Sequence, residues 1–465
     1  MAIHKIAIVG GGIAGLATAW FIKDRFANSG DDVSIKIFEQ QHRMGGTIGV
    51  TRQDGFIVDW GPNGFLDKSP LTLEMIGALR LSDQLIKAND NAANRFIYKK
   101  GQLQQIHMHP FKFMTSNLLS LFGRLRLAAE PFIATKSSTV DETIWQFAAR
   151  RMGSEAADTL ITPMVHGIFG GDAKQLSLAA CFPKMIALEE TYGSLIKGMI
   201  AKKKQSQTVS AGPAGTLTTL NGGMHTLVET LEAHFANDII KGISVDPITL
   251  FPNQEKRSLS LGWSYGSAFF DTVVLACPLY EVAKLTKAIA SKASAIADNI
   301  PYVGMVVVAH GYDVNALSHP INGFGFLVAP NEEKQILGCI ATSNIFPHQA
   351  PDGKILLRTM LPISAGLPTD DAYWSKIAQD DLKDVMGITA PPCFEKVFQF
   401  KRAIPQYQLG HLEAIANLEA DLLATGNIYL SGNAYEGVGI NDVIKRSKKI
   451  AEQIANAICL PPKGK

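Results

Sequence analysis

The sequence contains few charged residues and lacks any hydrophobic run long enough to cross a membrane. Asp, Glu, Lys and Arg together make up 18% of its 465 residues, and the formal net charge is +2. So small a basic excess is unsuited to a phosphate backbone, which argues against a nucleic-acid partner. Hydrophobic residues reach 46%, yet no stretch of about eighteen mostly apolar residues occurs, so we expect no transmembrane helix. A chain of this length has room for two or three domains.

Cysteine is also scarce, and its spacing does not suit a metal site. The five cysteines include no CxxC pair and have no histidine nearby at metal-ligand spacing. We expect buried thiols in a reducing compartment at Cys181, Cys277, Cys339, Cys393 and Cys459. The opening residues, MAIHKIAIVGGG, lead directly into a predicted strand with no signal or transit pattern before it, which favours a cytoplasmic location.

Residues 5–20 carry the pattern of a dinucleotide-binding turn. They read KIAIVGGGIAGLATAW: an apolar β run, glycines at positions 10, 12 and 15, and a helical pattern whose N-terminus would face the phosphates. The three glycines allow a tight turn, close approach to a pyrophosphate, and packing of the helix on the strand. A second predicted strand, 33–38, ends at Glu39, whose carboxylate would accept hydrogen bonds from the adenosine ribose. These signals predict a nucleotide site that includes Gly10, Gly11, Gly12, Ile13, Ala14, Gly15, Glu39 and Gln40.

The segment after Glu39 bears on the choice between NAD and FAD. Residues 43–47, RMGGT, resemble the arginine and double-glycine stretch of the amine oxidase and protoporphyrinogen oxidase flavoprotein superfamily. The glycines would let backbone pass close to a long cofactor, and Arg43 would neutralise a phosphate. Residues 59–64, DWGPNG, add a stiff turn that lies against the flavin ring in this superfamily. The resemblance implies FAD, with contacts from Arg43, Gly46, Thr47, Gly61, Pro62, Asn63 and Gly64.

The far end of the chain carries a second flavin signal. Residues 427–458 contain a short predicted strand, a glycine-containing loop, and a helix begun by Asn441 or Asp442. The N-terminus of that helix presents unpaired amides, which suit the pyrimidine oxygen of a reduced flavin. The sequence YEGVGIND is similar to the C-terminal flavin signature of the protoporphyrinogen oxidases, and it implies contacts from Asn433, Val438, Gly439 and Ile440.

The fold class implied is α/β, with an FAD-binding Rossmann-like domain of the amine oxidase type assembled from separated segments. The apolar run 271–277 suits a strand buried on both faces that rejoins the N-terminal sheet. A loose alignment with the family places an adenine contact at Ile239. We expect an FAD-binding domain at 1–80, 213–285 and 425–465, a mixed α+β substrate domain at 81–90 and 286–424, and a helical, membrane-associating insertion at 91–212.

The insertion contains apolar residues at helical spacing, with cations close by. The apolar residues are Phe111, Met114, Leu118, Leu121, Phe122, Leu125 and Phe132; the cations are Lys112, Arg124 and Arg126. Such a stripe is either core or an interfacial helix on a bilayer. The resemblance favours the membrane, because family members are peripheral membrane proteins, and Lys202, Lys203 and Lys204 could help on an anionic surface. A capping box at 139–142 predicts one further helix.

Motifs across the whole chain resemble the protoporphyrinogen oxidase family in order, and they indicate a substrate. They lie at 94–98, 166–177, 323–328 and 337–347. The family resemblance implies that Arg95 pairs with a propionate, that Phe324, Leu327 and Met360 form walls beside the macrocycle, and that Gly167 and Gly170 line the cavity. A porphyrinogen requires an apolar cavity with a cation at its edge to pair with a propionate.

The implied activity is oxidation of protoporphyrinogen IX to protoporphyrin IX, by an oxygen-dependent oxidoreductase acting on CH–CH groups in haem biosynthesis. Hydride would pass to flavin N5 in three two-electron rounds, with dioxygen as acceptor and peroxide as product. We assign no catalytic acid or base and no metal. The family also implies association with the inner face of the cell membrane and a neighbouring ferrochelatase.

Three alternatives stay open. The same family includes oxidation of coproporphyrinogen III, whose four propionates call for more cations. The same fold also serves amine oxidases and carotenoid desaturases. A flavin- or porphyrin-binding protein of the membrane surface without catalysis is the third.

Overall fold

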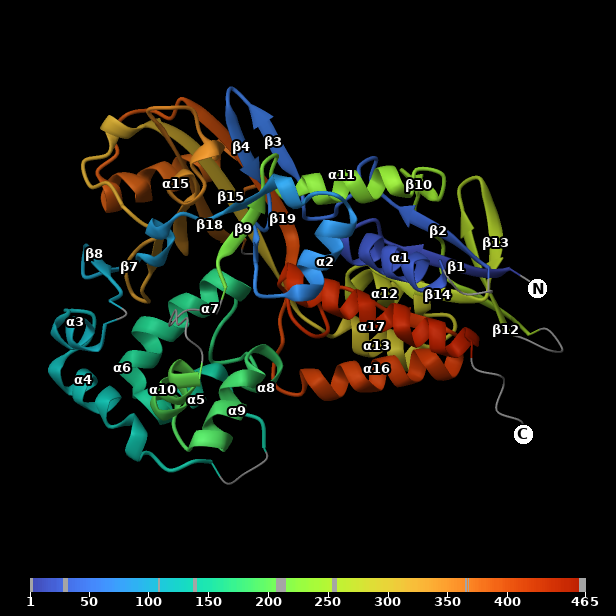
Figure 1. Ribbon diagram of the computed structural model, residues 1–465, viewed down its shortest axis with the longest axis horizontal. Helices are drawn as coiled ribbons and strands as arrows, with labels where there is room; N and C mark the ends of the chain where they lie inside the picture. Colours follow the sequence, from blue (N-terminus) through green and yellow to red (C-terminus); the bar gives the residue numbers. More distant parts are fainter. Residues whose placement is uncertain are drawn as a thin grey trace.

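The computed structural model describes residues 3–27, 32–107, 109–136, 140–205, 215–252, 257–363, 366 and 368–459. A parallel sheet with its helices occupies the right of Figure 1, a larger mixed sheet the upper left, and a group of helices the lower left.

The parallel sheet joins strands that are far apart in the sequence. Its order is β10 (Ile239–Lys241), β2 (Val33–Glu39), β1 (His4–Val9), β14 (Thr272–Leu275) and β20 (Ile428–Leu430). In β1, Ile6 pairs with Ile35 on one side and with Thr272 on the other, and all neighbours run parallel. All four residues of β14 are buried, because helices cover both faces. The run at 271–277 thus joins the N-terminal sheet, as predicted.

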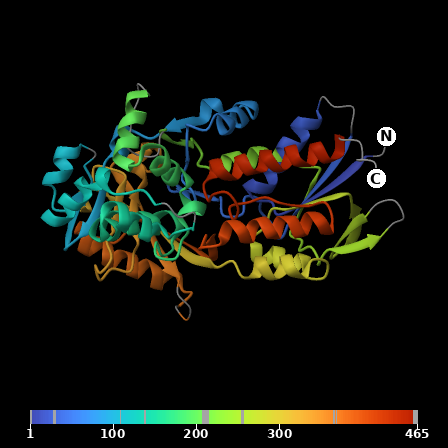
Figure 2. The ribbon, with the colours of Figure 1, turned by 90° about the horizontal axis from the view of Figure 1, so that it is seen from below.

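Side chains of β1 alternate between two helical layers, which Figure 2 shows from below. Ile6 and Ile8 pack with one layer, and Ala7 and Val9 with the other. The first layer holds α1 (Ile13–Phe26), α2 (Pro70–Ala78), α11 (His225–His234) and α17 (Ile440–Cys459). The second holds α12 (Leu279–Thr286), α13 (Ser291–Asp298) and α16 (His411–Thr425).

The mixed sheet has seven strands and stands beside the carboxyl end of the parallel sheet. Its order is β19 (Phe394–Pro405), β15 (Tyr302–Asp313), β18 (Lys354–Ile363), β17 (Gly338–Ala341), β16 (Gly325–Val328), β7 (Arg95–Lys99) and β8 (Gln102–Gln105). Only β16 and β7 pair in parallel among these described strands. Helix α15 (Asp371–Met386) packs on one face through Trp374, Leu382 and other apolar residues.

Smaller strands and short helices connect these parts. They are β3 (Val50–Gln53), β4 (Phe56–Asp59), β5 (Phe65–Leu66), β6 (Leu85–Lys87), β9 (Leu217–Leu220), β11 (Thr249–Pro252), β12 (Arg257–Trp263), β13 (Gly266–Phe270) and α14 (Thr342–Ile345), with 3₁₀ turns at Ser82–Gln84, Asp90–Ala93, Val314–Ala316 and Pro347–Gln349.

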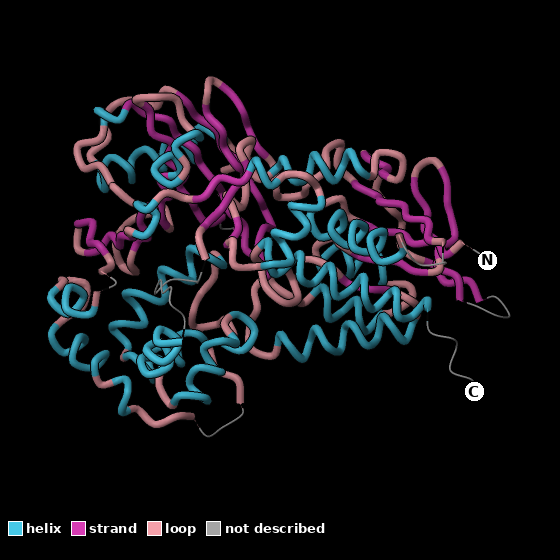
Figure 3. The backbone as a smooth tube through the Cα atoms, viewed as in Figure 1, coloured by secondary structure: helices cyan, strands magenta, loops and turns pink. Residues whose placement is uncertain are grey.

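The third region is helical, as the cyan tube at the lower left of Figure 3 shows. It contains α3 (Pro110–Thr115), α4 (Leu121–Ala128), α5 (Ile144–Met152), α6 (Ser154–Ala156), a π-helical turn (Ala157–Ile161), α7 (Thr162–Phe169), α8 (Leu178–Cys181), α9 (Pro183–Tyr192) and α10 (Leu195–Gln205), with a 3₁₀ turn at Glu130–Phe132. A buried ion pair between Arg151 and Glu130 ties α5 to that 3₁₀ turn.

The apolar stripe of the insertion is two short helices rather than one. Residues 116–120 separate α3 from α4, where the Ser120 hydroxyl caps α4 by accepting a hydrogen bond from the Gly123 amide (3.0 Å). Leu118 turns inward and is fully buried. Within the described residues, no helix is both long and apolar enough to span a bilayer.

The structure corrects two other sequence predictions, the position of the capping box and the burial of the cysteines. The capping box lies at Thr143 and Gln146, at the start of α5, and not at 139–142; Thr139 is outside the described residues. Of the five thiols expected to be buried, only Cys339 is fully so. Cys181 and Cys277 are partly buried, and Cys393 and Cys459 are exposed, because they lie just before β19 and at the end of α17.

Candidate flavin site

One cavity of about 1180 Å³ opens between the carboxyl end of the parallel sheet and the mixed sheet. Its sheet-end wall comes from the residues that follow β1, β2, β10 and β14, namely Gly10, Gly12, Gln40, Gln41, Ile243, Ser244, Val245, Ala276, Cys277 and Pro278. Its opposite wall comes from β15, β18 and β19. A crevice outside the carboxyl ends of parallel strands is where such sheets bind ligands.

The glycine turn between β1 and α1 leaves a cradle made of backbone. Gly10 has φ +114, and a Cβ there would overlap with the Ala276 carbonyl. Gly12 is the N-cap of α1 and makes no side-chain cap, so the first amides of a 14-residue helix stay free for an anion. A Cβ on Gly12 would meet nothing nearer than 4.0 Å, and one on Gly46 nothing nearer than 3.5 Å. This open space fits a pyrophosphate.

Glu39 braces that turn and also lines the cavity. One carboxylate oxygen accepts the Gly11 amide (2.7 Å), and the other accepts the Gln41 amide (2.8 Å). Each carboxylate oxygen has a further lone pair, so the group can still accept a ribose hydroxyl. The role predicted for Glu39 therefore has a second part, orientation of the Gly11 amide.

Arg43 holds its own loop in shape. Its guanidinium donates to the carbonyls of Met44 (3.2 Å), Gly46 (2.5 Å) and Ile48 (3.3 Å), and it lies 4.4 Å from the centre of the Trp60 ring. Burial lowers the pKa of Arg43, and Glu39 partly opposes that shift. Neutralisation of a phosphate by Arg43 stays a prediction, since these donors already serve backbone oxygens.

The turn from Trp60 to Asn63 is held from the opposite sheet. Arg358 of β18 donates to the Asn63 side-chain oxygen (2.7 Å) and to the Gly61 carbonyl (2.8 Å). A Cβ on Gly61 would come within 2.6 Å of the Thr47 carbonyl, so the turn packs closely on the 43–47 segment. Trp60 also stacks on Phe398 of β19, with ring centres 5.3 Å apart.

The C-terminal loop is clamped by Tyr407, a residue that sequence motifs did not indicate. The Tyr407 hydroxyl donates to the Asn433 carbonyl and accepts the Gly437 amide (3.1 Å). His411 stacks on the Tyr407 ring at 4.2 Å and contacts the Ala434 carbonyl through Nε2 (2.9 Å). The loop therefore enters α17 from a fixed position.

Helix α17 begins at Ile440, one or two residues before the predicted start. Asn441 does not cap it. Its side chain donates to the Leu66 carbonyl (2.9 Å) and accepts from the Thr72 hydroxyl (2.7 Å), which ties α17 to β5 and α2. Val438 and Ile440 line the cavity at this helix N-terminus.

Comparison with known proteins agrees with this geometry. The family described as "Flavin containing amine oxidoreductase" matches residues 13–455. The chain belongs to this family. It is 29% identical over 458 residues to coproporphyrinogen III oxidase of Bacillus subtilis (95% of this chain, 96% of the relative). It is 27% identical over 483 residues to protoporphyrinogen oxidase of Bos taurus (97% and 98%).

Solved structures show the same relationship. A structure described as a putative protoporphyrinogen oxidase of Exiguobacterium sp. 255-15 superposes with a TM-score of 0.84, at 26% identity, over 98% of this chain and 99% of that one. Cyclohexylamine oxidase of Brevibacterium oxydans, at 15% identity and a TM-score of 0.70 over 98% of this chain and 100% of that one, shares the fold. This flavin-containing oxidoreductase is FAD-dependent, and the backbone cradle between Gly12 and Gly46 fits that cofactor.

Most of the predicted FAD contacts meet in the cavity. Those that line it are Gly10, Gly12, Ile13, Ala14, Glu39, Gln40, Arg43, Gly46, Thr47, Gly61, Pro62, Asn63, Asn433, Val438 and Ile440. Gly11, Gly15, Gly64 and Gly439 are also predicted as contacts, and they do not line it. Ile239 lies within β10 and does not line the cavity; Ile243, Ser244 and Val245, just after that strand, do.

The predicted substrate residues divide into two groups. Gly167 and Met360 line the cavity. Leu327 lies directly behind Gly167, where a Cβ on that glycine would come within 2.9 Å of it. Gly170 caps α7 at φ +62, and Arg95 stands 5.4 Å from the Phe324 ring on the β7–β16 side of the mixed sheet. Neither Arg95 nor Phe324 lines the cavity.

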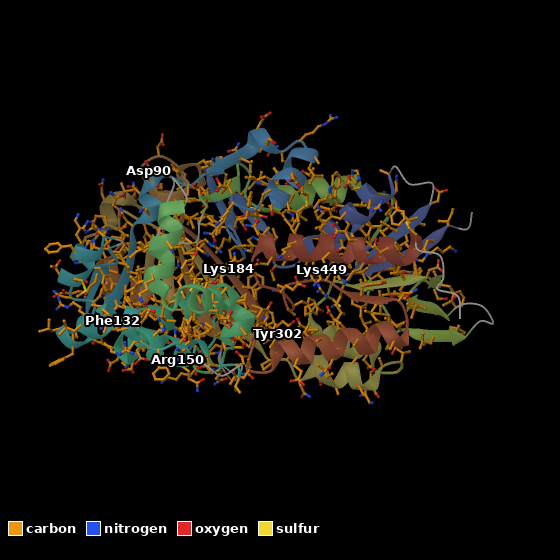
Figure 4. All side chains as sticks on the ribbon, turned by 60° about the horizontal axis from the view of Figure 1, so that its bottom comes forward. Asp90, Phe132, Arg150, Lys184, Tyr302 and Lys449 are labelled. Carbon is orange, nitrogen blue, oxygen red and sulfur yellow. The ribbon has the colours of Figure 1, made fainter. Side chains whose placement is uncertain are left out.

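The cavity has cations that no motif indicated. Arg358, Lys401 and Arg402 line it from β18 and β19, Tyr302 lines it from the start of β15, and Tyr280 lines it from α12 of the FAD region. Figure 4 labels Tyr302 where the helical region and the FAD region meet. Among the described residues, no cluster of His, Cys, Asp or Glu is arranged to hold a metal ion.

Proposed function

We propose that this FAD-dependent enzyme oxidises a porphyrinogen to the corresponding porphyrin. The carrying observation is a single cavity that runs from the dinucleotide cradle to an apolar sheet face with cations on it. Met305, Val307 and Met360 supply apolar surface, and Lys401 and Arg402 supply positive charge. A broad apolar macrocycle with carboxylate arms needs both features. Relatives named for this reaction cover nearly the whole chain.

When bound, FAD would supply the redox chemistry: in each round it would take two electrons and one proton from the substrate as hydride, a second proton would leave a pyrrole nitrogen for solvent, and dioxygen would take up the two electrons and two protons to become hydrogen peroxide. Three such rounds remove six electrons and six protons, with three molecules of dioxygen becoming three of peroxide. The chain itself binds the macrocycle, orients it and excludes water. Among the described residues of the mixed-sheet wall, none is a carboxylate or a histidine, so we assign no acid or base.

Protoporphyrinogen IX is the first candidate substrate, and coproporphyrinogen III is the second. The second is favoured by Lys401 and Arg402, because two extra propionates require extra cations. Arg402 lies 4.8 Å from the centre of the Tyr280 ring, so its guanidinium is held at the rim. Steady-state kinetics with both porphyrinogens decides: a higher kcat/KM for one identifies the substrate, and activity on neither, with amines oxidised instead, contradicts the proposal.

Lys401 and Arg402, which we call the rim residues of the cavity, lie at a bulge in the mixed sheet. Val303 pairs with Ile404 and Met305 with Phe400, so Lys401, Arg402 and Ala403 face only Gly304. A Cβ on Gly304 would come within 2.7 Å of the Lys401 carbonyl, which is why glycine occupies this position. Bulges of this kind re-aim side chains beside active sites.

A membrane surface is part of the proposal. Phe111, Leu121, Phe122, Leu125 and Phe132 are all more than half exposed, on α3, α4 and the 3₁₀ turn that follows. Phe132, labelled in Figure 4, lies on the side of the helical region away from the FAD region. Such a patch next to cations suits the interface of the cell membrane, on its inner face. Lys202 is exposed, whereas the side chains of Lys203 and Lys204 lie outside the described residues. Delivery of the porphyrin to ferrochelatase stays a prediction.

Flotation with anionic phospholipid vesicles tests the membrane part. We expect the protein to float with the vesicles, and Phe122→Glu combined with Phe132→Glu to abolish flotation without loss of FAD. Phe251→Glu, at an exposed phenylalanine of β11 outside the helical region, is the matched control. Equal flotation of all three proteins would count against membrane binding through this patch.

A further inference from the structure

Arg358 is a buried cation on the wall of the cavity. It is 4% exposed and projects from β18. Its two terminal nitrogens donate to neutral oxygens of the Trp60–Asn63 turn. Its Nε is buried and has no hydrogen-bond partner among the described residues. Within the described chain, no carboxylate oxygen lies within 4.0 Å of a guanidinium nitrogen of Arg358, so it forms no ion pair there.

A buried charge without a paired counter-charge is costly unless a bound partner compensates it. Burial lowers the pKa of Arg358 to about 10, and Asp59 opposes that shift, so the guanidinium stays charged at neutral pH. Asp59 is the carboxylate that most affects it; burial raises the Asp59 pKa to about 6, so Asp59 is ionised at neutral pH, but its oxygens lie beyond ion-pair distance from the guanidinium. The turn thus keeps a positive charge that the protein compensates incompletely.

The direction of the cofactor along the cavity places this charge near the flavin. The adenosine belongs at Glu39 and Val245, after β2 and β10, and the pyrophosphate at the N-terminus of α1. We therefore place the isoalloxazine at the far end, where the lining residues include the Trp60–Asn63 turn, Val438 and Ile440. Arg358 is bonded to that same turn.

We propose that Arg358 is a positioning residue whose positive charge stabilises the flavin after reduction, when the ring system carries negative charge, and so raises the reduction potential of the bound cofactor. A fixed charge that is itself buried, as Arg358 is, acts more strongly than one in solvent. The inference depends on FAD binding and not on which substrate is oxidised, so it survives or fails separately from the proposed function.

The test is the midpoint potential of the flavin in purified, FAD-loaded protein, measured anaerobically against reference dyes at pH 8. Arg358→Gln removes the charge and keeps a donor. We expect a loss of about tenfold in the preference for reduced over oxidised flavin, equal to a fall of about 30 mV for a two-electron couple. Arg358→Lys keeps the charge, and it should recover most of that potential.

Two further variants separate charge from structure. Asp59→Asn removes the nearby negative charge and should raise the potential; it decides the matter alone if Arg358→Gln retains no FAD. Lys354→Gln removes a partly exposed cation of the same strand, β18, that pairs with Asp313 and lies outside the cavity, and should leave the potential unchanged. An unchanged potential in Arg358→Gln or in Asp59→Asn would overturn the proposal. So would equal falls in the Gln and Lys variants, or a rise in porphyrinogen KM alone, which would make Arg358 a site for substrate carboxylate.

Discussion

Gly15 of helix α1 packs directly against the carbonyl oxygen of Gly10, with no room for a Cβ between them. This contact fixes where the helix begins relative to β1, and therefore where its free amides face. Gly12, three residues earlier, is open on the cavity side. The two glycines thus serve folding and binding separately.

Substitution by alanine should separate these two roles. Gly15→Ala overpacks the turn, and we expect it to lower the stability of the apoprotein by about 1–3 kcal/mol. Gly12→Ala should melt within a few degrees of wild type, yet bind FAD at least about tenfold more weakly, because its methyl group enters the cradle. Thermal unfolding without FAD and a fluorescence titration with FAD measure the two effects. Normal FAD affinity in Gly12→Ala would show that the phosphates lie elsewhere.

Tyr407 should affect cofactor affinity although it does not line the cavity. Tyr407→Phe leaves the Gly437 amide and the Asn433 carbonyl without their partner, at a cost of about 1–3 kcal/mol if they stay buried. We expect FAD to dissociate about tenfold faster or more. Tyr373→Phe, on α15 away from the FAD loop, is the matched control. Equal FAD dissociation rates in both variants and in wild type would show that Tyr407 does not contribute to cofactor binding.

Asp59 should make the stability of the apoprotein depend on pH with an unusual sign. Burial raises its pKa from 3.8 in the unfolded chain to about 6, with Arg358, Arg52, the Met224 amide and Gln349 opposing the shift. As pH rises from about 4 to 6, the unfolded state loses this proton while the folded state keeps it, so folding is progressively penalised. The penalty is on the order of 3 kcal/mol and levels off above pH 6.

Urea unfolding of wild type and Asp59→Asn across this range measures that penalty. The stability of the variant relative to wild type should rise between pH 4 and pH 6 and then stay constant. A constant difference throughout would mean that Asp59 is ionised in the folded protein over the whole range.

Arg402 should discriminate between porphyrinogens by their number of carboxylates. Arg402→Ala should lower kcat/KM for coproporphyrinogen III by about tenfold or more, and for protoporphyrinogen IX by less. Only the tetracarboxylate has two additional propionates that can pair with the cations of β19. Lys376→Ala, on the surface of α15, controls for net charge. Loss of FAD from Arg402→Ala, with equal effects on both substrates, would assign this arginine to the cofactor.

The parts of the site that sequence predicted are those built from contiguous residues. The β1–α1 turn and Glu39 follow one another in a fixed local pattern, and the apolar run at β14 is buried because of its own composition. Arg358, Lys401 and Arg402 depend instead on the register of three antiparallel strands, and the bulge opposite Gly304 has no counterpart in a motif. Leu118 is a further example. Hydrophobic spacing alone predicts one continuous apolar stripe through this residue, but Ser120 caps a new helix and Leu118 is buried.

The central claim is that one cavity holds FAD and a porphyrinogen in contact, and anaerobic mixing tests it most directly. FAD-loaded protein is combined with protoporphyrinogen IX or coproporphyrinogen III, and flavin absorbance near 450 nm is followed together with porphyrin fluorescence. We predict rapid bleaching of the flavin and a matching gain of fluorescence with at least one of the two. Oxidised flavin that persists with both, while an amine or a polyene bleaches it, would contradict the account.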